Sequence, residues 1–320
     1  MILNTTAETM TASEKELIQS QKLQKLVERC YKKIYFYQQR IDALNINYTS
    51  ITHIHDISKL PFTTANDLAI NYPFGLLTMP INGVARFEQT TDFHKVIGFT
   101  IQDLAWQKEM IARTLFACHI NAASILLELP EPFPSSGARS LQQTAENLGI
   151  AVIVSHESDD QSCLKKILDF GVTTLFATPN KLLAFADFLQ KQNIAKHDIP
   201  LINIICEAHH CPANLRDTLM DKFQVPVYTL YGHPDIMCLG IAGECYQQKG
   251  LHIQDDHFYP EIINPHDGKI LDDGQPGELV LTTLSREATP LLRYRTDETA
   301  ILTHEHCPCG RTSARLTLVP

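Results

Sequence analysis

The sequence predicts an α/β fold, in which a body of mostly parallel strands flanked by helices is followed by a smaller β-rich subdomain. Two observations carry this prediction. Short β-rich runs alternate with amphipathic helical segments between residues 124 and 231, and strand-like runs with turn signals dominate from residue 232 onward. Such alternation implies right-handed crossovers and a sheet covered on both faces. We therefore expect an α/β body over residues 1–231 and a β-rich subdomain over residues 232–320.

The part of the chain before residue 124 is predicted to be helical. Ser13 and Glu16 form a capping-box pattern, and apolar residues follow at helical spacing from Leu23 to Ile34. A second helix is expected over about residues 102–118. The alternating units place strands at 124–129, 151–154, 173–177, 201–206 and 227–231, and helices at 140–148, 160–170, 181–192 and 213–223.

Composition narrows the class of protein. The 320 residues are 44% hydrophobic and 20% charged, as in ordinary globular proteins. A net charge of −9 argues against nucleic acid as a partner, because binding a phosphate backbone needs a basic face. No apolar run approaches the length of a membrane span, and the N-terminus lacks a secretory signal pattern. The odd number of cysteines, nine, argues against a disulfide framework and favours a reducing cytoplasm.

Four candidate metal ligands stand in the C-terminal part of the chain. Cys307 and Cys309 place two thiolates on one tight turn, and Cys245 and His252 add a thiolate and an imidazole. Three thiolates and one imidazole are a recognised structural zinc set, and a closed set of four protein ligands implies a staple rather than catalysis. The alternative is that these are ordinary buried thiols beside an unrelated histidine. Other histidines that could compete for the fourth position are His257, His304 and His306.

Several segments follow one another in the order of a known family. They read LPFTTANDLAINYPFGLL at 60–77, GFT-x-x-DL at 98–104, TPN at 178–180, and then GELVLTTL, LLRYRT and CPCGR. Together they are similar to the phenylacetate–coenzyme A ligase branch of the adenylate-forming, AMP-binding enzymes, over about residues 21–320. The resemblance implies the large N-terminal domain of enzymes that use ATP and Mg²⁺ to form an acyl-adenylate and then pass the acyl group to coenzyme A. It also implies zinc at the four positions named above.

The stretch that corresponds to the family's phosphate loop is altered. FEQTTDFH at 87–94 keeps Thr90 and Thr91 but contains no glycine, and Phe93 stands at the lysine position. Two acidic residues in this stretch would face a polyphosphate with like charge. Lys95 lies close by in sequence and could compensate in part. The loop is therefore predicted not to hold ATP phosphates in the family's manner.

Other nucleotide-contacting positions are partly kept, by the same resemblance. Ala208 lies in the adenine-contacting stretch, and Tyr231 and Gly232 open the motif that follows it. Asp235 is one methylene shorter than the glutamate that assists Mg²⁺, and Glu298 stands where an aspartate binds the ribose. The candidate cofactor-binding set is Ala208, Tyr231, Gly232, Arg295 and Glu298, and the candidate degenerate catalytic residues are Thr90, Thr91 and Asp235.

Two functional hypotheses follow. The first is a degenerate domain without independent ligase turnover, which acts by binding a catalytic paralogue, a carrier protein or an acyl ligand. The alternative is a divergent acid–CoA ligase that works with a lid domain supplied in trans or by further chain. The resemblance predicts a C-terminal lid of about a hundred residues after CPCGR, and we expect that lid to be absent from these 320 residues. Because relatives are commonly dimeric, a homodimer is a further expectation.

Three other features have simpler explanations. His209, His210 and Cys211 suggest a metal site or an activated thiol, but adjacent loop side chains rarely converge on one ligand. Phe133 stands where relatives line an acyl pocket, although a proline-rich surface loop explains it equally. Trp106 is most simply a core residue of the helix expected over 102–118.

Overall fold

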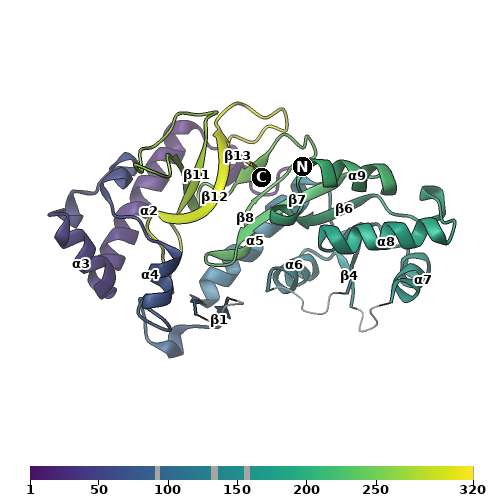
Figure 1. Ribbon diagram of the computed structural model, residues 1–320, viewed down its shortest axis with the longest axis horizontal. Coiled ribbons are helices and arrows are strands. Elements are labelled where there is room, and N and C mark those ends of the chain that lie inside the picture. The colour runs from purple at the N-terminus through teal and green to yellow at the C-terminus, as the bar shows by residue number, and fades with distance from the viewer. Residues whose placement is uncertain (91–93, 131–135, 155–158, 320) are drawn as a thin grey trace. The chain divides into compact units, whose positions relative to one another are not determined.

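The computed structural model describes residues 1–90, 94–130, 136–154 and 159–319, whose course is drawn in Figure 1. The chain forms two compact units. The first comprises residues 1–3, 108–232 and 238–251, and the second comprises 4–107, 233–237 and 252–320. The predicted α/β class is confirmed. The boundary predicted between residues 231 and 232 stays a prediction, because the two units interleave along the chain and need not be independent domains.

Parallel strands form the centre of the first unit. The parallel strands follow the spatial order β7-β6-β5-β3-β4, with β8 beside β7, and β3 pairs in parallel with both β4 and β5. The strands are β3 Ile125–Glu128, β4 Ala151–Ile153, β5 Thr174–Phe176, β6 Asn203–Glu207, β7 Val227–His233 and β8 Met237–Gly243. The helices between or before them are α5 Ile101–Ala117, α6 Ser136–Asn147, α7 Asp160–Phe170, α8 Pro179–Lys191 and α9 Ala213–Phe223.

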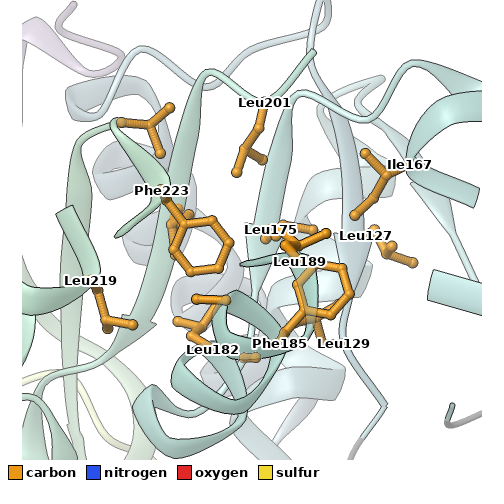
Figure 2. Packing of buried hydrophobic residues seen from close by; sticks show 14 of the residues in the cluster. Leu127, Leu129, Ile167, Leu175, Leu182, Phe185, Leu189, Leu201, Leu219 and Phe223 are labelled. Atoms are coloured by element: carbon orange, nitrogen blue, oxygen red, sulfur yellow. The ribbon is translucent and has the colours of Figure 1, made fainter. Parts of the chain in front are cut away.

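Successive residues of these strands bury their side chains in different clusters. Leu127 and Leu175 pack in a cluster with Phe185 of α8, which Figure 2 shows from close by. Their neighbours Leu126 and Phe176 belong to a second cluster, to which α5 and α6 contribute. This alternation confirms that helices cover both faces of the parallel strands, and each fully buried large apolar side chain contributes about 1.5–3 kcal/mol.

The helix limits in the first unit follow from capping residues. Asp159 accepts a hydrogen bond from Ser162 N at the start of α7, and the helix ends at Gly171 in a left-handed conformation with φ 67°. Thr178 caps α8, with Pro179 in the first turn, so this helix begins two residues before its predicted start. Apolar spacing alone does not show such caps, and for α8 it set the helix start too late.

Helices and antiparallel strands build the second unit. The helices are α1 Thr5–Glu8, α2 Ala12–Lys33, α3 Tyr35–Ala43, α4 Ala65–Ile70 and several short 3-10 turns. Strands β1 Arg86–Gln89 and β2 Val96–Phe99 form a two-stranded sheet, and five further strands follow the order β10-β11-β12-β13-β9. These five are β9 Leu251–Ile253, β10 Phe258–Ile263, β11 Pro276–Thr283, β12 Tyr294–Thr303 and β13 Arg315–Leu318. The β-rich character predicted for the C-terminal part is confirmed.

The predicted capping box of the long N-terminal helix was wrong by two residues. Thr11, not Ser13, is the N-cap of α2, and its hydroxyl accepts from Glu14 N while the Glu14 carboxylate accepts from Thr11 N. Thr11 is extended (φ −64°, ψ 159°), as an N-cap must be, whereas Ser13 already lies inside the helix. Within the described ranges, no helix combines the length and apolarity that crossing a membrane requires.

Candidate functional site

The hairpin of β1 and β2 frames the altered phosphate-loop stretch. Thr90 is buried just after β1, and its backbone N–H donates to Lys95 O at 3.1 Å, which closes the described part of the hairpin. Glu88, expected to face phosphate, is instead paired with Arg86 at 3.2 Å. Thr91 lies outside the described residues. Glu88 and Thr90 therefore have bonding partners within the hairpin.

Asp235 is the best-placed carboxylate of the candidate nucleotide site. Its Oδ2 lies 2.9 Å from Lys95 Nζ and also accepts a hydrogen bond from the Tyr294 hydroxyl. The side chains of Lys95 and Asp235 are only 16% and 4% exposed, so the ion pair is largely desolvated. The other carboxylate oxygen, Oδ1, is buried and has no hydrogen-bond partner among the described residues. An internal cation thus neutralises the carboxylate that the sequence assigned to Mg²⁺.

Tyr294 completes this buried constellation. Burial raises the pKa of the Tyr294 hydroxyl, and the negative charge of Asp235 raises it further. Both effects disfavour the phenolate, because it would be a second anion in a site of low dielectric constant. Tyr294 therefore stays neutral and acts as a hydrogen-bond donor to Asp235.

His233 orders the backbone beside Asp235, a role that the sequence did not reveal. Its Nδ1 accepts a hydrogen bond from Asp235 N at 3.1 Å, so Nε2 carries the ring proton. Nε2 lies 3.3 Å from Thr296 O and 4.0 Å from a carboxylate oxygen of Glu298. The ring also packs edge-on against Tyr294, with the ring centroids 5.5 Å apart. Glu298, the predicted ribose ligand, thus lies near His233 in the middle of β12.

Arg295, another predicted cofactor-binding residue, has partners inside the second unit. Its Nε lies 2.9 Å from Glu278 Oε1, and its Nη2 donates to Pro265 O at 3.0 Å. The hydrogen bond and charge of Glu278 raise the pKa of this guanidinium further. The pair joins neighbouring strands β11 and β12, so Arg295 has a structural role whether or not it also meets a ligand.

Sequence reasoning missed two buried charged residues that shape this part of the second unit. Asp103 accepts hydrogen bonds from Glu287 N at 2.8 Å and from Ala288 N at 3.1 Å. Arg286 lies over the Phe99 ring, 4.2 Å from its centroid, and burial lowers the pKa of its guanidinium. The only sequence signal was that Asp103 lies in the segment GFT-x-x-DL and Arg286 in the segment SREATP. Neither segment predicts which groups these side chains contact.

Three predicted cofactor-binding residues lie in the first unit. Ala208 is buried in the 3-10 turn Ala208–His210, and Tyr231 is fully buried in β7. The His209 ring packs against Tyr231 with a centroid separation of 5.1 Å, and its Nε2 contacts Gly232 O. Gly232 cannot be replaced without rearrangement, because a Cβ atom there would lie 2.0 Å from Cys238 O. These residues are compactly arranged within their own unit.

Cys211, considered above as an activated thiol, has a cysteine as its neighbour and not the expected histidine. Cys211 is hydrogen-bonded to the buried thiol of Cys206, which lowers the pKa of Cys211 and raises that of Cys206. The predicted partner His210 has a side chain outside the described part, and Phe133 lies wholly outside it. Trp106, predicted as a core residue, is only half-buried and packs against His257, with ring centroids 5.7 Å apart.

Three of the four predicted zinc ligands lie together in the second unit. The ligand atoms of His252, Cys307 and Cys309 are within 4.8 Å of one another, and Cys309 Sγ lies 3.5 Å from His252 Nε2. The turn is closed by Gly310 N, which donates to Cys307 O at 3.0 Å. Cys245 belongs to the first unit, where its side chain is fully buried.

Neighbouring residues hold these ligands from behind. His252 Nδ1 lies 3.0 Å from Ser313 Oγ, which leaves Nε2 as the ring atom facing Cys309. Arg311 donates to Cys309 Sγ at 3.7 Å and is itself held by Glu8, whose carboxylate is 2.6 Å from the guanidinium. Support of this kind is what orients metal ligands in proteins.

The competing histidines have other surroundings. His304 Nδ1 lies 2.8 Å from an Asp273 carboxylate oxygen at an exposed position. His257 lies 3.3 Å from an Asp256 oxygen and packs against Trp106. Neither belongs to the cluster around His252, which leaves His252 as the imidazole of the candidate zinc site among these.

Several known proteins are similar to this chain over nearly its whole length. No family model matches the chain. A phenylacetate-coenzyme A ligase of Thermus thermophilus is 31% identical over 313 residues, which cover 97% of this chain and 70% of that protein. The protein of the same name from Aromatoleum evansii is 32% identical, over 96% and 71% of the two chains. A solved open conformation of 2-hydroxyisobutyryl-CoA ligase, in complex with 2-HIB-AMP and CoA, has a TM-score of 0.88 at 18% identity, over 97% of this chain and 70% of that one, and it shows the fold.

Proposed function

The chain belongs to the phenylacetate–coenzyme A ligase family, and we propose that it is a degenerate member, which binds an acyl ligand or a partner protein without forming an acyl-adenylate by itself. The partner would be a catalytic paralogue or a carrier protein. One observation carries the proposal: Lys95 and Tyr294 already occupy Oδ2 of Asp235, the carboxylate at the Mg²⁺-assisting position.

The contacts of Asp235 with Lys95 and Tyr294 bear on whether this carboxylate can assist Mg²⁺ in nucleotide binding. Mg²⁺ needs near-ideal octahedral coordination by oxygens, and a carboxylate that serves it must be free to face the metal and the phosphates. Mg²⁺ would have to use the remaining oxygen, Oδ1, beside the Lys95 ammonium, and this neighbouring cation disfavours a second cation at the same carboxylate. The donor set of this site therefore does not fit Mg²⁺ held by Asp235 in the family's manner.

The hairpin supports the same conclusion for the phosphates. Glu88 contributes negative charge beside Arg86, and Thr90 N is used within the hairpin by Lys95 O. A phosphate-binding loop needs several free backbone N–H groups and residues that tolerate close approach, which glycine provides. The stretch 87–94 contains no glycine.

Pyrophosphate exchange tests the proposal. The purified chain should show no ATP–pyrophosphate exchange with a panel of aryl and short acyl acids, and ATP with Mg²⁺ should not raise its melting temperature. The Thermus thermophilus relative, assayed with phenylacetate, is the positive control. Binding of an acyl ligand without ATP, seen as thermal stabilisation by an acid of the panel, is expected. Clear exchange with any acid would contradict the proposal.

The second candidate is a divergent aryl- or acyl-acid adenylating enzyme that works with a lid domain in trans and uses ATP, Mg²⁺ and coenzyme A. Its support is that the relatives at 31% and 32% identity are named as ligases, and that carboxylates persist at Asp235 and Glu298. Exchange that appears only after the lid domain of a relative is added would favour this candidate over the first.

We also propose a structural zinc ion held by His252, Cys307, Cys309 and Cys245. The first three converge in the second unit, and the Ser313 hydroxyl can accept a hydrogen bond from Nδ1 in the His252 tautomer whose Nε2 binds a metal. Only six residues separate Cys245 from His252, so chain connectivity keeps the fourth thiolate within reach. When bound, the metal would supply a cross-link and no catalytic step. Metal analysis of the purified protein should give about one equivalent of zinc.

A further inference from the structure

Glu16 of α2 and two histidines, His53 and His55, converge on one point of the surface of the second unit. His53 Nε2 lies 2.8 Å from Glu16 Oε1, and His55 Nε2 lies 3.6 Å from the same oxygen. The three ligand atoms are all within 4.8 Å of one another, and the two imidazole rings are 4.9 Å apart. The side chains are 43–73% exposed, so a hydrated ion can reach them.

The backbone under these side chains is fixed on both sides. Ile54, between the two histidines, is buried, and its N–H donates to Ser20 Oγ at 2.9 Å. Since Ile54 points inward, the histidines on either side of it are free to reach the surface. Gln24 adds a hydrogen bond to Thr52 O at 2.5 Å. Three residues of α2 at successive turns, Glu16, Ser20 and Gln24, thus hold the segment that carries both histidines.

The 3-10 turn after His53 adds further order. Asp56 accepts hydrogen bonds from Thr52 N at 3.0 Å and from His53 N at 2.9 Å. Lys59 holds the other oxygen of Asp56 at 2.7 Å, and this turn is the helix η2, Ile54–Lys59. A ligand set on a rigid support loses little entropy when it binds an ion.

We propose that Glu16, His53 and His55 form a surface site for a divalent transition metal of the Zn²⁺, Co²⁺ and Ni²⁺ class. With metal–ligand distances of ~2.0–2.1 Å, the ligand atoms of a tetrahedral site lie ~3.3 Å apart. The two observed distances to Glu16, 2.8 and 3.6 Å, bracket that separation. Two imidazoles and one carboxylate suit these ions rather than Ca²⁺ or Mg²⁺, and water completes the coordination.

Metal binding requires one proton rearrangement. His53 Nδ1 accepts a long hydrogen bond of 3.4 Å from His55 N, so Nε2 carries the proton that faces Glu16. A metal at Nε2 displaces that proton to Nδ1 and removes only this long contact. The ion then replaces the hydrogen bonds to Glu16 by coordinate bonds and ties η2 to α2. This site is separate from the nucleotide-binding question and from the cysteine cluster.

Cobalt and calorimetry can test the site in the full chain as purified. Titration with Zn²⁺ should show an equivalent beyond any thiolate-bound metal, and Co²⁺ added at this step should give an absorption spectrum without thiolate-to-metal charge transfer. Glu16→Gln and His55→Asn should each weaken this equivalent at least about tenfold, the scale of loss when even supporting groups of a metal site are changed. Its binding should raise the melting temperature of the wild-type chain.

His197→Asn is the matched control, since His197 is also exposed and lies 3.5 Å from a carboxylate, that of Asp198, but has no second histidine beside it. It should leave the affinity unchanged. The proposal is overturned if no equivalent binds beyond the thiolate site, or if Glu16→Gln binds as tightly as the wild type. Circular dichroism of each variant shows whether the fold is kept, because all three substitutions lie on the surface.

Discussion

Two polar clusters of the second unit differ in how neighbouring side chains contact their ligand atoms. Around His252 and Cys309, the neighbours Ser313 and Arg311 contact the ligand residues and leave His252 Nε2 facing the other ligands. Around Asp235, the neighbours occupy the carboxylate oxygen itself, because Lys95 and Tyr294 both bond to Oδ2. The first arrangement directs an imidazole nitrogen at the Cys309 thiol, which suits the zinc ion proposed above, whereas the second pairs its carboxylate oxygen with a lysine of the protein.

The difference follows from the cost of burying charge. A buried carboxylate is tolerated only when it is paired and hydrogen-bonded, and a protein can meet that need with a bound metal or with a lysine. At the cysteine cluster the proposed zinc ion would meet this need for the thiolates. At Asp235 it is met internally, and the family's Mg²⁺ role is then no longer required for the fold to be stable. Preserved ligands are therefore weaker evidence for ion binding where a lysine already pairs with one of the ligand atoms, as Lys95 does at Asp235.

The largest effect is expected at the internal cation. Lys95→Met keeps the length of the side chain but leaves the Asp235 carboxylate buried with Tyr294 alone. Breaking a buried ion pair from one side costs about 3–5 kcal/mol, and we expect a loss of this size in the free energy of unfolding, measured by urea denaturation.

The matched control removes the charge that Lys95 neutralises. In an Asp235→Asn background, Lys95→Met should cost at least about 1 kcal/mol less, because contacting residues show coupling energies of this order. Equal costs in both backgrounds would mean that the ion pair does not stabilise the site. The proposed difference between the Asp235 site and the cysteine cluster would then have no energetic cause.

The cysteine cluster should give the next largest effect. Cys307→Ser removes one thiolate, so the protein should lose its zinc and, with it, about 3–4 kcal/mol of stability, as expected for an ion present at 100 to 1,000 times its dissociation constant. Metal analysis and denaturation measure both. Cys163→Ser, at a buried cysteine of α7, controls for placing a hydroxyl in the core and should keep the metal. An unchanged metal content and an unchanged stability in Cys307→Ser would contradict the proposed zinc site.

Much of the fold could be predicted because its signals are local. Hydrophobic spacing placed helix α7 at residues 160–170, in agreement with the structure, since Asp159 and Gly171 mark its ends in sequence. The capping box at Ser13 failed because Thr11 offers the same chemistry two residues earlier, and only the extended backbone of Thr11 decides between them. Element type was therefore accessible, and the first residue was predicted for α7 but not for α2.

The candidate sites divide in the same manner. His252, Cys307 and Cys309 were found because few residue types bind zinc, and the structure brings these three together. The pairing of Lys95 with Asp235 could not be predicted, because 140 residues separate the two and nothing in either segment encodes the contact. Ligand chemistry can be inferred from sequence, but the partner that satisfies a buried charge depends on the tertiary fold.

The smallest expected effect concerns Tyr294 and depends on pH. Burial and the Asp235 charge raise the pKa of Tyr294 in the folded state, whereas in the unfolded chain it ionises near pH ~10. The contribution of the neutral hydroxyl is therefore fully present below pH ~10 and is lost as pH rises further, since the unfolded state releases the proton first. Tyr294→Phe should cost about 1 kcal/mol at pH ~8, and this cost should shrink above pH ~10.

Denaturation curves from pH ~8 to ~11 measure this convergence, with Tyr35→Phe as the control at an exposed tyrosine. The Tyr35→Phe variant should follow the wild type throughout. Parallel curves for Tyr294→Phe and the wild type would mean that Asp235 does not hold the phenol neutral. Convergence would instead show that Oδ2 of Asp235 accepts the Tyr294 hydrogen bond within the protein, which is the contact that separates this carboxylate from the cysteine cluster.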